Sequence, residues 1–222
     1  MIKTDTQLQE EKKKRTRLLI IASVAVSAVI MILPAAVVFS RAYFTYLFTK
    51  PEEHYIVEDY LLYRNGPYVR EEYKVKWGMD ETIWPEVITG DMDVQDYAMI
   101  RYAPFDAQFL GYLVVDYEEE PYAVERSRLE TYNEECGRTD YIGIYGATGF
   151  EDYELLAMYA DEENGFVYAL TDGTKRIIYV EIIFKNYFMD LDYTQYIPEE
   201  YLPEGFDASP DNPYRAMMST EE

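Results

Sequence analysis

Cysteine and histidine are almost absent from this chain of 222 residues, which holds only Cys136 and His54. One thiol makes no internal disulfide, so the fold depends on its core. Structural zinc sites need several Cys or His ligands, and these two residues lie far apart in the sequence. Hydrolytic triads need a histidine that shuttles the proton, and His54 sits close to an apolar segment that we assign to the membrane. The sequence therefore disfavours zinc and triad chemistry.

Basic residues are also scarce, with 20 Lys and Arg against 42 Asp and Glu, for a net charge of −22. The deficit is uneven. Residues 1–17 hold six basic and three acidic residues, 6 − 3 = +3, and residues 18–222 hold 14 basic and 39 acidic residues, 14 − 39 = −25. A domain this acidic repels phosphate backbones, so nucleic acid is excluded as a partner. It attracts cations or basic proteins instead.

One long stretch, residues 18–39, has no charged residue at all. As a helix it would be ~33 Å long, enough to cross a hydrocarbon core of ~30 Å. The basic cluster at residues 12–17 outweighs Arg41 and Lys50, which places the N-terminus in the cytoplasm. A cleaved signal peptide is the alternative, with a small-residue pattern at Ser40-Arg41-Ala42. The length of the apolar stretch favours an uncleaved, single-pass signal-anchor.

After residues 40–54, which we assign to a stalk, the pattern of apolar and turn-forming residues predicts an antiparallel sheet. Residues 97–102 and 109–117 form a hairpin about a turn at residues 104–106. Further strands are predicted over the segments 141–145, 153–159, 166–172 and 176–184. Asn164-Gly165 and Asp172-Gly173 are strong hairpin signals, because a type I′ turn requires positive φ at both central positions. The last three strands should therefore form a meander.

One main helix is expected to pack on this sheet, from residue 118 to 132, with Tyr122, Leu129 and Tyr132 on its buried face. In the last strand, residues 178, 180, 182 and 184 face the core, and the opposite face is mixed. We also predict a strand over 73–77 and a short helix over 80–87. The fold class is therefore α+β.

The chain divides into five parts on these grounds. They are a cytoplasmic basic tail (1–17), a transmembrane helix (18–39), a stalk (40–54), an extracytoplasmic α+β domain (55–203) and a flexible acidic tail (204–222).

Several segments resemble a group of uncharacterised exported or membrane-anchored proteins of anaerobic Gram-positive bacteria. The segments are WPEVITGDMDVQDYAMIRY, FDAQFLGYLVVDYEEEPYAVERSRL, YELLAMYADEENGFVYAL and EEYLPEGFD, within residues 84–206. In that group an acidic and aromatic strand pair precedes a helix of the kind marked here by Tyr122, Glu125, Arg128 and Leu129. The resemblance implies export and α+β character, and it implies no activity and no site residues.

No residue is singled out as catalytic, cofactor-binding or metal-ligating. Calcium takes carboxylate and carbonyl oxygens, which residues 91–96 and 161–164 offer. The first segment is not an EF-hand loop, because its sixth position is Asp96 and its twelfth is Tyr102. The second segment is typical of a solvated hairpin turn. Paired carboxylates run glycoside hydrolysis, but among so many acidic residues some pair lies close by chance.

The chain has 24 tyrosines, and we expect most of them at half-buried strand positions. A cluster of exposed tyrosines would instead indicate a binding surface. The sequence thus favours a membrane-anchored domain outside the cell that binds a surface protein or carbohydrate without catalysis. The alternative is a carboxylate-dependent hydrolase of wall polysaccharide or peptide. We expect no cofactor.

Overall fold

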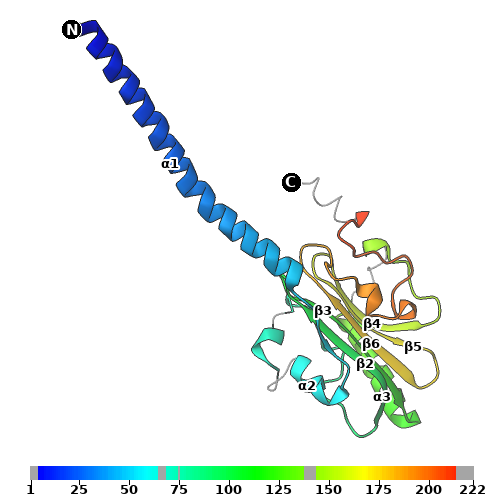
Figure 1. Ribbon diagram of the computed structural model, residues 1–222. Helices are drawn as coiled ribbons and strands as arrows, with labels where there is room; N and C mark the ends of the chain where they lie inside the picture. The colour runs from blue at the N-terminus through cyan, green and yellow to red at the C-terminus, as the bar shows by residue number, and fades with distance from the viewer. Residues whose placement is uncertain (1–4, 65–68, 75, 138–143, 214–222) are drawn as a thin grey trace. The chain divides into compact units, whose positions relative to one another are not determined.

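The computed structural model describes residues 5–64, 69–74, 76–137 and 144–213. The chain separates into two compact units, residues 1–49 and residues 50–222 (Figure 1). The first is a single helix and the second is the acidic domain.

The first unit is helix α1 (Asp5–Phe48), whose 44 residues make a rod of ~66 Å. Its apolar side chains are exposed along most of its length. Among the described residues, the segment Ile30–Phe48 is long enough and apolar enough to span a membrane. It starts later than the predicted span, and α1 continues through the first part of the predicted stalk. An apolar helix near the N-terminus is compatible with a membrane anchor or a signal sequence.

The second unit is built on one antiparallel sheet in the order β1-β2-β3-β6-β5-β4. Its strands are β1 (Glu52–His54), β2 (Met92–Tyr102), β3 (Gln108–Tyr117), β4 (Glu154–Asp161), β5 (Gly165–Thr171) and β6 (Arg176–Ile183). The helices are α2 (Tyr60–Tyr63) and α3 (Glu119–Glu135), with 3-10 turns η1 (Val57–Asp59), η2 (Glu71–Tyr73), η3 (Ile144–Gly146), η4 (Tyr193–Gln195) and η5 (Glu199–Tyr201). The predicted α+β class with one main packing helix is confirmed.

Both predicted hairpin regions are present, although the turns differ from the expected type. The β4–β5 loop has three residues between the paired Asp161 and Gly165, and only Gly165 has a positive φ, of 106°. The β5–β6 loop follows the pair Thr171 and Ile177, so it too is longer than a two-residue type I′ turn. The meander β6-β5-β4 is confirmed.

Each face of the sheet carries its own apolar core. The first core lies under α2, α3 and residues 79–88, and includes Tyr179 of β6 together with Tyr122 and Leu129 of α3. The second core holds the opposite side chains of β6 and is covered by residues 184–208. The prediction that one face of β6 would be mixed is wrong: Ile177, Tyr179, Glu181 and Ile183 are all fully buried. This face is the one covered by α2, α3 and residues 79–88, which come from distant parts of the sequence, so the period of two within β6 gave no sign of its burial.

Four other predictions need correction. Where a strand was expected over 73–77, Tyr73 ends η2 and Trp77 has a φ of 56°; residue 75 lies outside the described residues. The helix expected over 80–87 is a series of turns, since the Asp80 carboxylate accepts the backbone N–H of Thr82.

Where a strand was expected over 141–145, residues 144–146 form η3, and residues 141–143 are not described. The expected flexible tail is partly packed: Ala208 and Asn212 are buried, and the Met189 N–H donates to the Ala208 carbonyl at 2.8 Å. Residues 214–222 lie outside the described part.

Candidate functional site

A groove of about 800 Å³ opens between residues 81–92 and the first half of α3. The residues that line it are Arg64, Glu81, Thr82, Trp84, Pro85, Glu86, Val87, Thr89, Asp91, Met92, Tyr117, Glu120, Pro121, Val124, Glu125 and Arg128. We refer to it as the α3 groove. It combines a charged floor, an apolar wall and an acidic rim.

Residues 80–84, on the loop side of the groove, are held in place by contacts with the sheet and with α3. Ile83 and Trp84 are buried against the sheet. Arg128 of α3 donates to the carbonyl oxygens of Thr82 and Ile83 at 2.8 and 2.7 Å. Tyr132 donates to the Asp80 carboxylate at 2.8 Å. The turns over residues 80–84 are thus tied to α3, which fixes this end of the groove.

Beneath the groove lies a cluster of four buried charges from four separate segments, Arg64, Lys76, Glu81 and Glu181, which we call the floor. Arg64 and Glu81 line the groove itself, and Lys76 and Glu181 lie behind them. Arg64 reaches Glu81 at 2.8 Å and Glu181 at 3.4 Å. Lys76 reaches the same two carboxylates at 2.8 and 2.9 Å. All four side chains are at most 4% exposed. Two cations and two anions cancel, which is the condition for keeping charges in an interior of low dielectric.

Burial raises the pKa of the Glu181 carboxyl, and Glu81 adds to that increase, while Lys76 and Arg64 oppose it. Glu181 is paired with Gly111 across β3 and β6. A Cβ at Gly111 would lie 2.4 Å from the Met99 sulfur but 3.5 Å, an ordinary contact distance, from the Glu181 Cγ. The glycine therefore leaves room for the Met99 side chain beside Glu181.

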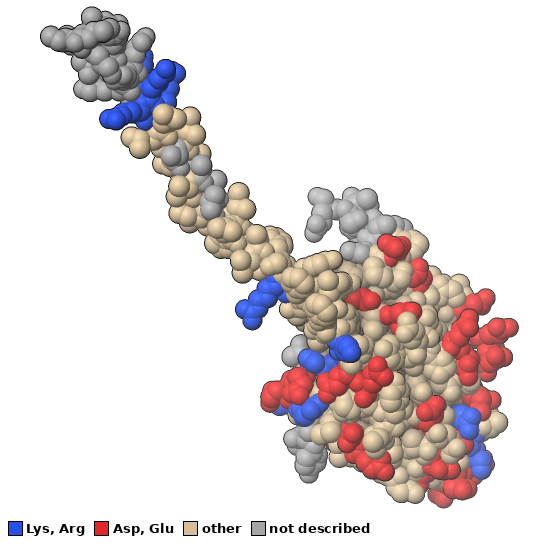
Figure 2. Space-filling model, in the orientation of Figure 1, with Lys and Arg blue, Asp and Glu red and all other residues tan. Residues whose placement is uncertain are grey.

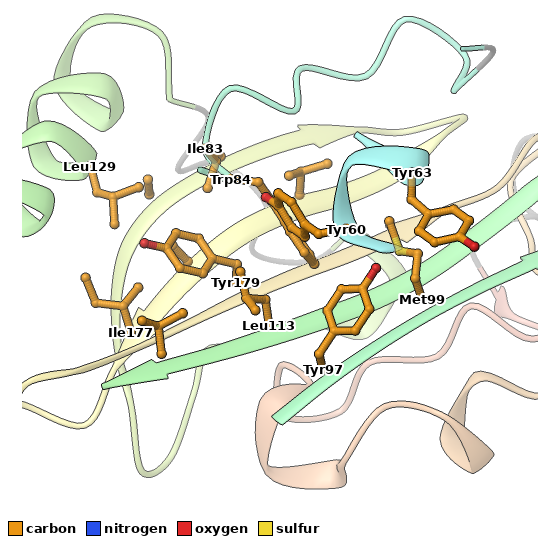
Figure 3. Packing of buried hydrophobic residues seen from close by; sticks show 14 of the residues in the cluster. Tyr60, Tyr63, Ile83, Trp84, Tyr97, Met99, Leu113, Leu129, Ile177 and Tyr179 are labelled. Atoms are coloured by element: carbon orange, nitrogen blue, oxygen red, sulfur yellow. The ribbon is translucent and has the colours of Figure 1, made fainter. Parts of the chain in front are cut away.

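Aromatic rings pack against the two floor cations. Figure 3 shows part of this aromatic cluster. The figure shows Tyr60 and Tyr63 of α2, Trp84 of the loop and Tyr97 of β2 gathered over the same face of the sheet. The guanidinium carbon of Arg64 lies 5.0 Å from the Trp84 ring centroid, a cation–π contact. The Lys76 ammonium lies 5.2 Å from the Phe109 ring centroid. The floor charges are therefore shielded from water as well as paired.

The helix side of the groove holds a second polar chain. Tyr179 donates to the Glu125 carboxylate at 2.7 Å and lies 2.9 Å from the Tyr117 hydroxyl. Arg128 holds the same carboxylate with two hydrogen bonds of 2.7 and 2.8 Å. These hydrogen bonds to Glu125 raise the pKa of Arg128. Glu125 is thus fully engaged by protein groups.

The rest of the groove is open. Val87 is 45% exposed and Val124 is 66% exposed, so two aliphatic side chains from opposite sides face water. Glu86, Asp91 and Glu120 are exposed at the same groove. A hydrogen bond from Thr89 lowers the pKa of the fully exposed Asp91. The groove can accept an apolar group beside a positive charge.

The segments that the sequence suggested for calcium do not form a metal site. Asp96 accepts hydrogen bonds from the Tyr97 N–H and from the Tyr112 hydroxyl, and Asp161 accepts three from its own turn. Within residues 5–64, 69–74, 76–137 and 144–213, no three His, Cys, Asp or Glu side chains are placed to share a metal ion. Of the acidic residues in these two segments, only Asp91 lines the α3 groove.

His54 and Cys136 lie outside the groove. The His54 ring is 3.1 Å from the Glu52 carboxylate and packs on Tyr63 with ring centroids 4.4 Å apart. Cys136 is an exposed free thiol at the end of α3. Neither residue lines a pocket with a candidate nucleophile or ligand among the described residues.

Sequence reasoning missed all four floor residues. One signal was available: Glu181 is the only charge inside RIIYVEIIF after the first arginine, and a carboxylate in a buried strand requires a cation. The cations come from positions 76 and 64, which are 105 and 117 residues away, so no local pattern connects them.

No protein-family description, curated protein or solved structure matches this chain. The resemblance to exported proteins of Gram-positive anaerobes therefore stays a prediction. The function is inferred from the geometry of the groove and from the composition of the chain.

Proposed function

We propose that this protein is a single-pass membrane-anchored binding module, with its acidic domain outside the cell and the α3 groove as its binding site. The proposal rests on the contrast between the paired, buried charges of the floor and the exposed aliphatic side chains of the wall. The floor charges neutralise one another, while the aliphatic wall at Val87 and Val124 faces water without a covering element. Such an exposed apolar surface in a formed groove is typical of a binding site.

The anchor is supported by α1. Its exposed leucine, isoleucine and valine side chains have no packing partner among the described residues, and a lipid environment would remove them from water. Figure 2 shows the helix nearly free of charge between basic groups, whereas acidic side chains are spread over the visible face of the domain. The basic cluster at residues 12–17 favours a cytoplasmic N-terminus.

No observation favours the alternative of a carboxylate-dependent hydrolase. Such an enzyme needs one carboxylic acid that protonates the leaving group and a second, free carboxylate nearby. In the α3 groove, Glu81 is bound to Arg64 and Lys76, and Glu125 is bound to Arg128. Both carboxylates are engaged in ion pairs, which fits a structural role. The other three carboxylates of the groove, Glu86, Asp91 and Glu120, are exposed to water on its rim and lack the burial that favours a proton-donating carboxylic acid.

The topology is tested with the single native cysteine. Cys136 is exposed, so a membrane-impermeant maleimide should label it on intact cells. A matched variant carries Cys136→Ser and Lys13→Cys, which moves the only thiol to the basic tail. This variant should be labelled only after lysis. The reverse pattern would place the domain in the cytoplasm and contradict the proposal. A labelled product lacking the first ~40 residues would show a cleaved signal peptide.

The groove is tested by photo-crosslinking from Val124, which lines the groove and is 66% exposed. A photoreactive amino acid at position 124 should give a discrete adduct in intact cells. The control position is Phe105, which is similarly exposed at 62% and does not line the groove. No adduct at 124, or the same adduct from both positions, would remove the groove as the binding site.

A further inference from the structure

The rim of the α3 groove carries three negative charges, at Glu86, Asp91 and Glu120, all of them exposed. Among the described residues, none of the three has a basic side chain within ion-pair distance. Glu81 and Glu125 in the same groove are paired, so the rim is where uncompensated charge remains. Three carboxylates around an aliphatic wall are complementary to a ligand that carries positive charge next to an apolar side chain.

Two donors beneath the wall also point to a class of ligand. The Arg64 Nε–H and the Trp84 Nε1–H are buried and have no acceptor among the described residues. Both side chains line the groove and stack on each other. Buried donors of this kind usually find an acceptor, and a peptide carbonyl is one. A simple amine would not provide it, whereas a peptide segment has a carbonyl at every residue.

The charge of the domain decides which partner can supply such a segment. Residues 50–222 hold 13 basic and 39 acidic residues, a net charge of −26, so a second copy of this domain would be repelled. A basic protein segment would instead be attracted to the whole domain and then seated by the rim.

Resting on the proposed function, we infer that the α3 groove binds an extended peptide segment in which lysine or arginine alternates with large aliphatic residues. An aliphatic side chain lies between Val87 and Val124, over Trp84. The neighbouring basic groups pair with the rim carboxylates. Binding displaces the Trp84 ring enough for backbone carbonyls to accept from the buried Arg64 Nε–H and Trp84 Nε1–H.

The test uses the full chain in nanodiscs of zwitterionic lipid, with empty nanodiscs as the blank. Three short fluorescent peptides are titrated by anisotropy: alternating leucine and lysine, leucine and glutamate, and leucine and serine. The leucine-lysine peptide should bind at least about tenfold more tightly than either of the others. Its affinity should fall as salt is raised, because the rim charges are exposed.

Matched variants locate the binding. The rim triple Glu86→Gln, Asp91→Asn, Glu120→Gln should weaken the leucine-lysine peptide by about tenfold or more. A control triple, Glu151→Gln, Asp152→Asn, Glu199→Gln, makes the same change in charge at a different pocket and should leave the affinity within about twofold. Trp84→Phe keeps a ring but lacks the donor, and should weaken binding by about three- to tenfold.

The outcomes separate the two proposals. If Val124→Ser weakens the leucine-serine peptide as much as the leucine-lysine peptide and the rim triple has no effect, the groove binds but the ligand is not basic. The inference then fails and the proposed function stands. If both triples weaken binding equally, only the overall charge attracts the peptide, and the inference fails. If Val124→Ser and the rim triple both leave every affinity unchanged, the groove is not the site and both proposals fail.

Discussion

Glu181 sits in the middle of the most apolar strand of the sheet and is fully buried. A lone carboxylate there would be strongly unfavourable, and the cost is offset because Lys76 and Arg64 reach it from segments that precede β2. Such a network is weak evidence for stability in itself, but the loss of one member leaves an uncompensated buried charge. This asymmetry makes the floor testable one residue at a time.

We expect Lys76→Met to destabilise the domain by about 3–5 kcal/mol, because Glu81 and Glu181 would then share Arg64 alone. Chemical unfolding in urea, followed by circular dichroism, measures the change. Lys74→Met is the matched control, since Lys74 is about half exposed and pairs only with the exposed Glu71. The control should stay within about 1 kcal/mol.

A double variant, Lys76→Met with Glu181→Leu, should recover part of the loss, because Arg64 and Glu81 remain a balanced pair. We expect a favourable coupling of about 1–3 kcal/mol in the double-mutant cycle. Strict additivity of the two single effects would mean that Lys76 and Glu181 do not act as a pair.

At the scale of elements, the β4–β5 hairpin depends on one conformation that the sequence marks clearly. Asp161 caps the loop by accepting from the backbone N–H groups of Glu163 and Asn164, both at 3.0 Å. Gly165 then closes it with φ of 106°, and a Cβ there would lie 2.1 Å from the Ile182 carbonyl oxygen. Backbone strain and a steric clash coincide at this glycine.

Gly165→Ala should therefore cost about 2–5 kcal/mol, the sum of an unfavourable φ and a backbone displacement. Gly173→Ala is the control, because Gly173 also has a positive φ, of 76°, but nothing lies within 4 Å of its Cβ position. The control should cost about 1–2 kcal/mol. Urea unfolding of both variants measures these two stability costs. Equal losses of stability would show that β6 moves to accept the methyl group at position 165.

On the scale of the whole molecule, the tyrosines make the fold sensitive to alkali. Burial raises the pKa of Tyr63 and Tyr201 to about 12, and it raises the pKa of Tyr168 and Tyr179 well above the ordinary value for tyrosine. In the unfolded chain tyrosine ionises near pH ~10. Above that pH the folded state holds more protons than the unfolded state, so stability falls as pH rises through the folded pKa values.

We expect cooperative alkaline unfolding between about pH 10 and about pH 12. Tyrosinate absorbance and circular dichroism, recorded on the same sample, should change together. Added salt should shift the transition little, because desolvation of the rings drives it. A large protective effect of salt would assign the transition to the net negative charge of the domain instead.

Much of this architecture follows from the sequence alone. The uncharged run in α1, the β2–β3 hairpin, the α3 helix and the β4–β5–β6 meander all follow from local signals: periodicity, glycine turns and charge. Each signal lies within a few residues of the element that it specifies, so no distant contact is needed to detect it. The buried face of α3, with Tyr122 and Leu129, was predicted for the same reason.

The candidate site is different, because only the tertiary structure assembles it. The turns over residues 80–84 are held by Arg128 and Tyr132 of α3, which overrides the helical pattern predicted there. The two ion pairs to Glu181 join residues more than a hundred positions apart. The sequence alone determined an acidic α+β domain behind an apolar helix. Where its charges cancel and where an aliphatic surface stays exposed was decided by packing, since burial is a property of the assembled chain.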